Sequence, residues 1–272
     1  MTDRTVLITG CSSGIGRATA HAFLDEEWTV YATARDTDDV EDLADAGAVT
    51  ESLDVTKPAR CRTVVDDLVD EEGRLDCLVN NAGYGQFGTV EDVPTRKLNR
   101  QFDVNVYGPH RLIRAALPHM REQEEGTIVN LSSVAGRVSF PGMGTYSASK
   151  FALEAMSDAL RNEVDQHGID VALVEPGPVE TKFSKRVREE QEEIDETSAY
   201  ANVYELFRDY HSTGDAGASR PEDVAEVVLE AAVSPNPDPR YPVGTVGKAG
   251  VLARFVPDRI RDKIVSLALR LV

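Results

Sequence analysis

Short apolar runs alternate with longer amphipathic stretches over about the first 180 residues of the chain. The apolar runs are rich in Val, Ile and Leu, and they cover 5–9, 28–34, 48–53, 75–80, 127–132 and 169–174. The stretches between them place apolar residues at helical spacing, at about 15–26, 37–46, 57–72, 95–123 and 144–167. Strands that are apolar on both faces are typical of a parallel sheet covered by helices. The alternation therefore predicts an α/β fold, with a doubly wound parallel sheet and helices on both of its faces.

The alternation breaks down in residues 182–219. Charged residues dominate 185–196, and four aromatic residues follow them, namely Tyr200, Tyr204, Phe207 and Tyr210. The segment is either a pair of solvated helices or a mobile lid over a substrate pocket, with its aromatic side chains facing inward. The second interpretation makes residues 182–219 a substrate lid within the domain.

Residues 234–272 follow a helix that Pro221 opens, and they form a C-terminal extension. The first part of the extension, 234–242, is rich in proline and predicts a loop. The last part, 259–272, alternates basic and apolar residues at helical spacing, and we expect it to pack against its own domain or a partner subunit. We interpret residues 1–272 as a single domain, because no internal repeat or low-complexity segment divides them.

The chain is acidic, with 47 Asp and Glu residues against 29 Lys and Arg residues and a formal net charge of −18. This charge repels phosphate backbones and anionic lipid, so we expect no nucleic acid and no membrane as partners. The basic residues are 22 Arg and only 7 Lys. Few lysines and many carboxylates favour a halophilic source, where salt screens the repulsion between charges; an ordinary acidic enzyme is the alternative.

Cysteine and histidine residues show no pattern of a disulfide framework or a metal site. Cys11, Cys61 and Cys77 are odd in number and widely spaced, which favours reduced thiols. The five histidines lack the spacing of metal ligands. The first residues lead directly into an apolar run, without the pattern of a secretion signal. We therefore expect a cytoplasmic protein that binds no metal.

A glycine-rich segment, TGCSSGIG at 9–16, joins the first strand to the first helix. Glycine allows a tight turn and lets a pyrophosphate approach the main chain, and the helix N-terminus offers free N–H groups. Glycine also marks ordinary turns, but the strand–loop–helix context favours a Rossmann-type domain. We expect a dinucleotide to bind at Gly10, Ser12, Ser13, Gly14, Ile15 and Gly16.

The end of the second strand carries Arg35 followed by Asp36. An acidic side chain at such a position bonds the adenosine ribose of NAD, whereas an arginine accepts the 2′-phosphate of NADP. A guanidinium can pair with phosphate through two parallel hydrogen bonds. We therefore favour NADP as the cofactor, held by Arg35, with NAD as the less favoured choice; Arg35 as a plain surface charge is the alternative.

Three further strand ends carry candidate cofactor contacts. Asp54 can accept a hydrogen bond from the adenine amino group, or it can cap the next helix. The small residues of the segment Asn81, Ala82 and Gly83 suit a backbone close to the cofactor ribose, or a plain turn. The stiff loop at 176–181 can approach the nicotinamide, or simply cap the strand, and its candidate contacts are Pro176, Gly177, Val179 and Thr181.

Tyr146 and Lys150 lie one helical turn apart in a predicted helix, so they project from the same face. A free tyrosine has a pKa near 10, and a neighbouring ammonium together with an oxidised nicotinamide would lower that pKa toward the working range. Tyr146 can then exchange a proton with an alcohol or ketone. Ser133 follows the fifth strand and can hold the substrate oxygen; alternation turns its neighbour Ser132 to the opposite side. Asn105, a polar residue in an apolar stretch, is either a satisfied buried amide or part of a proton relay to Lys150.

Taken together, these motifs resemble the short-chain dehydrogenase/reductase family in order and spacing. The resemblance implies a catalytic tetrad of Asn105, Ser133, Tyr146 and Lys150. It implies that Lys150 also holds the nicotinamide ribose and that Asp54 and Val55 contact adenine. Family members usually form homodimers or homotetramers. Ala-Thr-Ala-Arg at 32–35, Asn-Ala-Gly-Tyr-Gly at 81–85 and the long C-terminal tail look like the 17β-hydroxysteroid and retinol dehydrogenase-like branch.

The sequence therefore predicts an oxidoreductase that transfers a hydride between NADP(H) and a hydrophobic secondary alcohol or ketone. A non-catalytic NADP-binding regulatory protein of the same fold is the alternative, and the intact Tyr146–Lys150 pair favours the enzyme. A sugar-nucleotide epimerase is disfavoured, because little of the chain remains beyond residue 182 for a second substrate domain.

Overall fold

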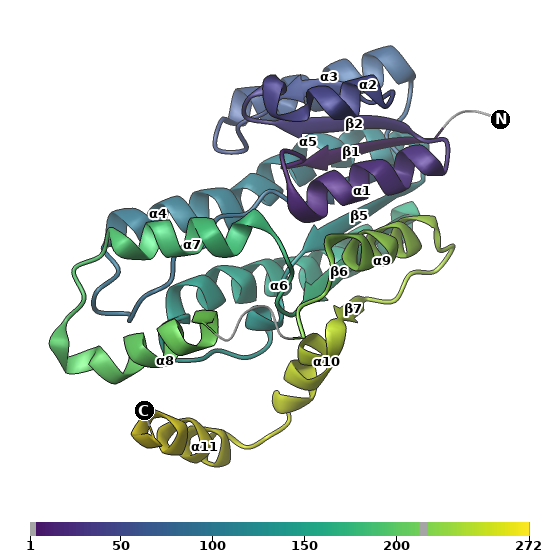
Figure 1. The fold of residues 1–272 in the computed structure, drawn as a ribbon. Helices are drawn as coiled ribbons and strands as arrows, with labels where there is room; N and C mark the ends of the chain where they lie inside the picture. Colours follow the sequence, from purple (N-terminus) through teal and green to yellow (C-terminus); the bar gives the residue numbers. More distant parts are fainter. Residues whose placement is uncertain (1–3, 213–216, 272) are drawn as a thin grey trace.

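The computed structural model of the chain describes residues 4–212 and 217–271, and it contains a parallel sheet with helices on both sides (Figure 1). The described residues form seven strands in the order β3-β2-β1-β4-β5-β6-β7. The strands are β1 (Thr5–Thr9), β2 (Thr29–Ala34), β3 (Val49–Ser52), β4 (Cys77–Asn80), β5 (Gly126–Leu131), β6 (Ile169–Pro176) and β7 (Arg240–Val243). The predicted doubly wound α/β fold is confirmed.

Helices cover both faces of the sheet because its central strands, β1, β4 and β5, are buried on both sides. The helices are α1 (Gly14–Asp25), α2 (Glu41–Asp45), α3 (Pro58–Glu72), α4 (Thr95–Phe102), α5 (Gly108–Gln123), α6 (Gly144–Val164), α7 (Lys182–Glu192), α8 (Ala201–Ser212), α9 (Pro221–Val233), α10 (Gly244–Ala253) and α11 (Asp258–Leu271). One buried core lies between the sheet and α1 and α9. A second core lies between the opposite face and α3, α5 and α6.

The strand order reverses between β1 and β4, which lie side by side and parallel. The carboxyl ends of these two strands therefore lie next to each other, and the space beyond them is the usual ligand site of such a sheet. Gly10 ends β1 with a φ of +76°, a conformation that favours glycine. A Cβ on Gly10 would lie 2.9 Å from the Cα of Ala82 in the turn after β4. Asn81 closes the contact, because its Nδ2 donates to the carbonyl of Thr9 at 2.7 Å and to that of Gly10 at 3.2 Å. The glycine loop and the turn after β4 therefore form one packed unit.

Two parts of the chain differ from the expected elements. The predicted loop at 234–242 contains the start of β7, which pairs with β6 through residues such as Tyr241 and Val174. Pro242 lacks a backbone N–H, but it is compatible with this strand because β7 is the edge strand of the sheet. The N–H groups on the outer side of an edge strand need no partner in a neighbouring strand. The predicted helical stretch at 95–123 is divided by a π-helical turn, Asp103–Tyr107.

The described helices include none that is long and apolar enough to cross a bilayer. The three cysteines are buried and unpaired with one another. Burial raises the pKa of the Cys11 thiol to about 12 and that of Cys61 to about 11. These thiols are therefore protonated at neutral pH and belong to the packing of the two cores.

Candidate dinucleotide and catalytic site

A cavity of about 1370 Å³ lies beyond the carboxyl ends of the strands and extends from the glycine loop to α7, α8 and α11. It exceeds the roughly 300–1,000 Å³ of a typical small-ligand pocket. A dinucleotide and a second small molecule can therefore share it. Most of the candidate cofactor residues line the cavity, namely Gly10, Ser12, Ser13, Gly14, Ile15, Arg35, Asp54, Val55, Asn81, Ala82, Gly83, Pro176, Gly177, Val179 and Thr181.

The glycine loop presents the start of α1 to the cavity. Ser13 precedes the helix, its side chain makes no cap bond, and the first turn carries no acidic residue. The first N–H groups and the positive end of the helix dipole are therefore suited to an anionic phosphate. Gly16 does not line the cavity. A Cβ there would lie 2.5 Å from the carbonyl oxygen of Gly10. Gly16 therefore allows the start of α1 to pack closely against the glycine loop.

At the far end of the cavity, Arg35 and Asp36 have different roles. Arg35 is exposed and lines the cavity. Asp36 does not line the cavity, and its carboxylate accepts a hydrogen bond from the backbone N–H of Asp38 at 3.2 Å, which caps the following short helix. A carboxylate engaged in this cap is less available to a ribose hydroxyl. Of these two side chains, Arg35 is therefore the one that faces the cavity.

Asp54 lies beside Arg35 as an ionised acceptor. Burial raises its pKa, but hydrogen bonds from Thr56 and the charges of Lys57 and Arg35 outweigh burial and hold the pKa below its ordinary value. Both hydrogen bonds from Thr56 reach Oδ1, at 2.9 Å from the backbone N–H and 2.8 Å from the hydroxyl. Oδ2 accepts no hydrogen bond from the part of the chain that the structure describes, so it can take one from an adenine amino group.

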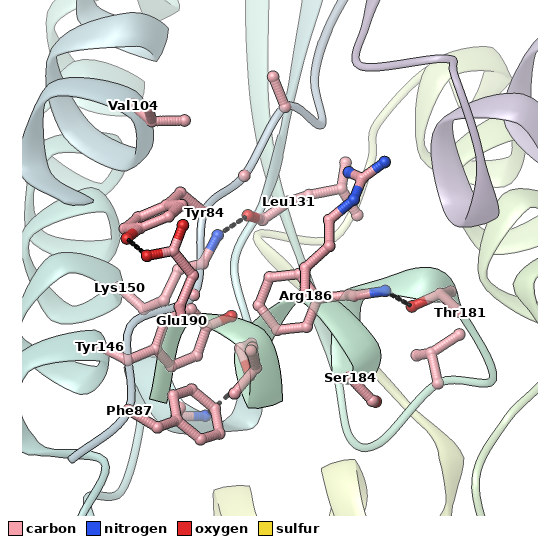
Figure 2. A pocket seen from close by; sticks show the side chains of 18 of the residues that line it. Tyr84, Phe87, Val104, Leu131, Tyr146, Lys150, Thr181, Ser184, Arg186 and Glu190 are labelled. Carbon is pink, nitrogen blue, oxygen red and sulfur yellow. Dashed lines mark hydrogen bonds between the residues drawn. The ribbon is translucent and has the colours of Figure 1, made fainter. Parts of the chain in front are cut away.

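The end of the cavity that contains Lys150 is built from β5, β6 and α6 (Figure 2). Lys150 is buried, and its Nζ donates to the carbonyl oxygen of Leu131 at 2.7 Å. Burial lowers the pKa of Lys150 to about 8, and the charge of Glu154 opposes this shift. Thr181 caps α7 by accepting a hydrogen bond from the N–H of Phe183, and its methyl group lies against Gly14. The loop after β6 therefore touches the glycine loop across the cavity.

Tyr146 projects into this cavity with 7% of its surface exposed. Its ring lies 5.3 Å from that of Phe87 and 6.0 Å from that of Phe183, centroid to centroid. The Nζ of Lys150 lies 5.9 Å from the centroid of the tyrosine ring. Burial raises the pKa of Tyr146 to about 12, and a hydrogen bond with Ser133 opposes the rise. Burial therefore sets the direction of the pKa shift of Tyr146 in the chain by itself. The lowering expected from Lys150 together with an oxidised nicotinamide stays a prediction.

Ser133 lies where the sequence placed it, beside Tyr146 and the loop after β6. Its hydroxyl accepts from the N–H of Ala135 at 3.1 Å and donates to the carbonyl of Pro176 at 3.4 Å. Ser132 is also among the residues that line the cavity. Its hydroxyl oxygen is nevertheless buried, and a Cβ on Gly136 would lie 2.7 Å from it, so the expectation that Ser132 turns to the other side is not contradicted.

Asn105 lies in the π-helical turn and does not line the cavity. Its side chain accepts from the N–H of Tyr84 at 2.8 Å and donates to the carbonyl of Tyr84 at 2.8 Å. It also donates to the hydroxyl of Ser149 at 3.0 Å. These bonds satisfy a buried amide and fix the chain after β4. No direct bond joins it to Lys150 among the described contacts, so the relay to Lys150 stays a prediction.

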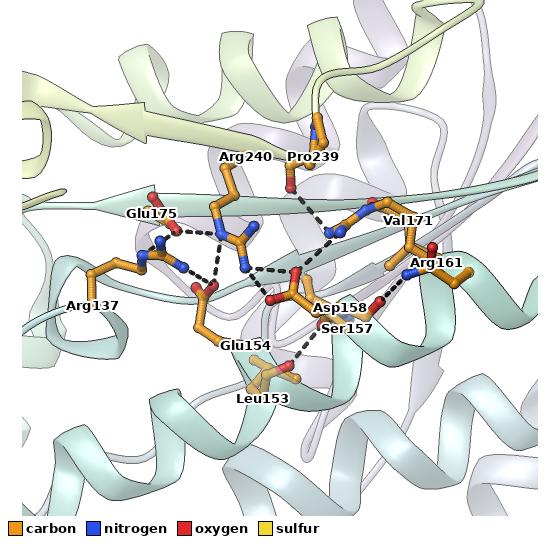
Figure 3. A network of polar contacts seen from close by, with 12 residues as sticks. Arg137, Leu153, Glu154, Ser157, Asp158, Arg161, Val171, Glu175, Pro239 and Arg240 are labelled. Atoms are coloured by element: carbon orange, nitrogen blue, oxygen red, sulfur yellow. Dashed lines mark hydrogen bonds and ion pairs between the residues drawn. The ribbon is translucent and has the colours of Figure 1, made fainter. Parts of the chain in front are cut away.

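A network of two buried glutamates and two half-buried arginines includes Glu154, one turn beyond Lys150 on α6 (Figure 3). Arg240 of β7 lies 3.1 Å from Glu154 and 3.2 Å from Glu175, and Arg137 lies 3.3 Å and 3.5 Å from the same carboxylates. Glu175 is fully buried. Burial and the charge of Glu154 raise the pKa of Glu175 to about 7, against the two arginines. This network joins α6, β6 and β7 directly before the Pro176–Gly177 turn.

The walls of the cavity come from residues that the sequence analysis did not single out. Phe183 and Val187 of α7 and Phe87 of the loop after β4 form an apolar cluster around Tyr146. Of the four aromatic residues expected to face inward, Phe207 lines the cavity, whereas the hydroxyl of Tyr204 donates to Asp92 at 2.7 Å. Tyr200 donates to Glu91 at 2.5 Å, away from the lining, and the side chain of Tyr210 lies outside the described residues.

A polar contact ties α7 to the rest of the domain. The hydroxyl of Tyr84 donates to Glu190 at 2.6 Å (Figure 2). The ammonium of Lys97, which is buried in α4, lies 2.8 Å from Glu190 and 2.9 Å from Glu193. These partners are about 90 to 106 residues apart in the sequence, so no local pattern predicts them.

Comparison with known proteins finds relatives along nearly the whole chain. The model of the family described as short chain dehydrogenase matches residues 4–192. The uncharacterized oxidoreductase YbbO of Escherichia coli K12 is 38% identical over 97% of this chain and 94% of its own. The 3-ketodihydrosphingosine reductase of Bacteroides thetaiotaomicron is 32% identical over 100% of this chain and 98% of its own. Human 17-beta-hydroxysteroid dehydrogenase type 1 is 34% identical over 89% of this chain and 77% of its own.

Solved structures show the same arrangement. A short-chain dehydrogenase from Streptomyces avermitilis has a TM-score of 0.84 and 36% identity, over 98% of this chain and 96% of its own. A short-chain dehydrogenase/reductase from Burkholderia phymatum, in complex with NAD, has a TM-score of 0.78 and 28% identity, over 97% and 95%. A serine dehydrogenase in complex with NADP⁺ has a TM-score of 0.77 and 26% identity, over 89% and 95%.

Proposed function

The chain belongs to the short-chain dehydrogenase/reductase family, and on that premise we propose that it transfers a hydride between NADP(H) and a hydrophobic secondary alcohol or ketone. The observation that carries the proposal is the cluster around the hydroxyl of Tyr146. That hydroxyl lies in an apolar part of a cavity whose other end is the glycine loop. An oxidoreductase of this family needs the dinucleotide-binding loop and the proton-donating tyrosine in the same cavity.

The side chains have separate tasks in this proposal. Tyr146 holds a proton at its phenol oxygen, and a pKa of about 12 keeps that proton in place at neutral pH. The protonated phenol is the form that donates to a ketone oxygen. Ser133 bonds the phenol and the substrate oxygen, and the ammonium of Lys150 adds positive charge beside the phenol. The nicotinamide, when bound, supplies or accepts the hydride.

NADP is the proposed cofactor because Arg35 faces the cavity while Asp36 caps a short helix. A guanidinium can pair with the 2′-phosphate, and a ribose-binding carboxylate would repel it. Solved relatives are bound to either dinucleotide, so this choice depends on these two side chains of the present chain.

A hydrophobic substrate is proposed because aromatic and aliphatic side chains surround Tyr146. Phe87, Phe183 and Phe207 line the cavity together with Met143 and Val187. Two relatives are named for a ketone or alcohol on a large apolar skeleton, 3-ketodihydrosphingosine and a 17-beta-hydroxysteroid. We propose that α7 and α8 form the lid over this part of the cavity, since each contributes a phenylalanine to it.

The test is the loss of NADPH absorbance with a panel of apolar ketones. Tyr146→Phe should lower kcat by about 10²–10⁴-fold, because general acid catalysis contributes that much. Tyr241→Phe removes a phenol that lies outside the cavity and serves as the matched control. Arg35→Asp should reverse the preference from NADPH to NADH in KM. Unchanged turnover in Tyr146→Phe would contradict the proposal. NADPH binding without turnover of any ketone would favour a regulatory protein.

A further inference from the structure

The charge of the chain is not evenly distributed. Residues 244–272 contain six basic and two acidic residues, a local net charge of +4. Because the whole chain carries −18, this leaves −22 for residues 1–243. The expectation of no membrane partner came from the average over the whole chain, and the C-terminal segment has the opposite sign. A molecule with this distribution presents its C-terminal end to a negatively charged surface.

The same segment carries a concentration of exposed apolar side chains. Among the residues whose exposure the structure describes, twelve large hydrophobic ones are exposed. Half of these belong to α10, α11 and their connection, namely Val246, Leu252, Phe255, Ile260, Ile264 and Leu267. Phe255 is 79% exposed and Leu252 is 68% exposed. α10 follows β7, and α11 extends beyond it to lie beside α8 (Figure 1). Single exposed apolar residues are ordinary, but a group on one short segment indicates an interaction surface.

α11 has one face against the protein and one face free. Leu269 packs against the cluster around Tyr146, and its carbonyl accepts from Asn202 of α8 at 3.3 Å. On the other face, Ile260, Ile264 and Leu267 fall within about 60° of one another at about 100° per residue. Lys263 follows one edge of this apolar strip. Arg261 follows the other edge, where it pairs with Asp258 at 2.7 Å. An apolar strip with basic flanks is typical of a helix that lies in the interface of an anionic bilayer.

α11 also forms part of the cavity rim. Ile264 and Val265 line the cavity, and Ile264 is at the same time 63% exposed. We propose that the free face of α10 and α11 docks on an anionic lipid bilayer, and that a membrane-dissolved alcohol or ketone enters the cavity past α11. The second part rests on the proposed function, and the docking itself does not. A second copy of the chain on this face would cover the rim at Ile264, whereas a bilayer is itself the reservoir of an apolar substrate.

The net negative charge of residues 1–243 does not prevent this docking. Repulsion between exposed charges is screened within a Debye length of about 8 Å at physiological ionic strength. Basic residues close to an anionic surface each contribute about 1 kcal/mol of attraction. Insertion of the apolar strip further stabilises the docked state, because it removes exposed apolar side chains from water.

The experiment is cosedimentation of the full chain with vesicles at physiological ionic strength. Vesicles of phosphatidylcholine with phosphatidylglycerol should bind the protein, and vesicles of phosphatidylcholine alone should bind it much less. Arg259→Glu with Lys263→Glu should weaken partitioning about tenfold or more, given the attraction per basic residue. Arg62→Glu with Arg114→Glu makes the same charge change on the exposed sides of α3 and α5, and it should retain binding.

A second pair of substitutions tests the apolar strip. Ile260→Ser with Leu267→Ser should also release the protein from the vesicles, and neither residue lines the cavity. All these variants should retain turnover of a water-soluble ketone, so a failure of docking is distinct from a failure of the proposed function. Equal partitioning of the wild type into both vesicle types, or into neither, would overturn the proposal. A serine variant that only dissociates an oligomer in sedimentation velocity would assign the face to a second copy and overturn it likewise.

Discussion

Glu175→Gln is the substitution whose effect follows most directly from the structure. Glu175 is fully buried between Arg137, Arg240 and a second carboxyl group, that of Glu154. Burial and the charge of Glu154 raise its pKa from an ordinary 4.5 to about 7. Each pKa unit corresponds to about 1.36 kcal/mol, so the whole shift corresponds to about 3 kcal/mol. Glutamine has a similar shape and no proton to lose, so the substitution removes this dependence on pH.

The sign follows from proton binding in the two states. Between pH 4.5 and about 7, the carboxyl of Glu175 is protonated in the folded chain and ionised in the unfolded chain. The folded state then binds more protons, so the free energy of unfolding falls as the pH rises through this window. Below the window both states are protonated, and above it both are ionised. The contribution of Glu175 is therefore fully present at low pH and lost above about pH 7.

Urea unfolding on the two sides of this window, at constant salt, measures the difference. The fall in the free energy of unfolding from the acidic to the alkaline side should be smaller in Glu175→Gln than in the wild type by about 3 kcal/mol. Any effect of the substitution on Arg137 and Arg240 that does not change with pH cancels in this comparison. Glu163→Gln, at an exposed position of α6, is the matched control and should leave the dependence unchanged. An identical pH dependence in Glu175→Gln and the wild type would refute the reasoning.

Three further predictions concern the loop, the lysine and the lid. Gly16→Ala should lower stability by about 1–3 kcal/mol and weaken NADPH binding in calorimetry, because the added Cβ meets backbone. Gly83→Ala, whose Cβ meets only ordinary contacts, should be tolerated in thermal unfolding. Glu154→Gln removes the charge that raises the pKa of Lys150. Since the pKa of Lys150 is about 8, the fall of kcat/KM at alkaline pH should then move below pH 8. An unchanged alkaline fall would argue against the effect of Glu154 on Lys150. Glu190→Gln should cost about 1–3 kcal/mol in urea unfolding, because a buried ammonium in α4 loses one of its two carboxylate partners.

The sequence predicted the features that depend on neighbouring residues. The glycine loop is continuous from β1 into α1, and Tyr146 and Lys150 lie one turn apart on one helix, so spacing alone places them together. The fold followed from the same logic, because strands that are apolar on both faces require helices on both sides.

The features that depend on distant contacts could not be predicted. β7 has four residues and contains Pro242, and it becomes a strand only by pairing with β6. The walls around Tyr146 also include Phe87 and Phe183, and no local pattern connects these to Phe207 of the predicted lid. Burial raises the pKa of Tyr146, and the sequence does not display this contribution because it depends on the walls of the cavity.

The position of Arg240 near the end of the chain has a consequence for synthesis on the ribosome. The strands that carry the glycine loop are complete by Asn80, and domains generally begin to fold from the N-terminus while the rest is still being made. Arg240 reaches Glu175 and Asp158 only after translation has passed residue 240. The strands of the first half can therefore form early, while Glu175 and Glu154 have Arg137 but not yet Arg240 as a cationic partner. A chain that ended before residue 240 would lack the contacts by which Arg240 joins Glu154, Asp158 and Glu175.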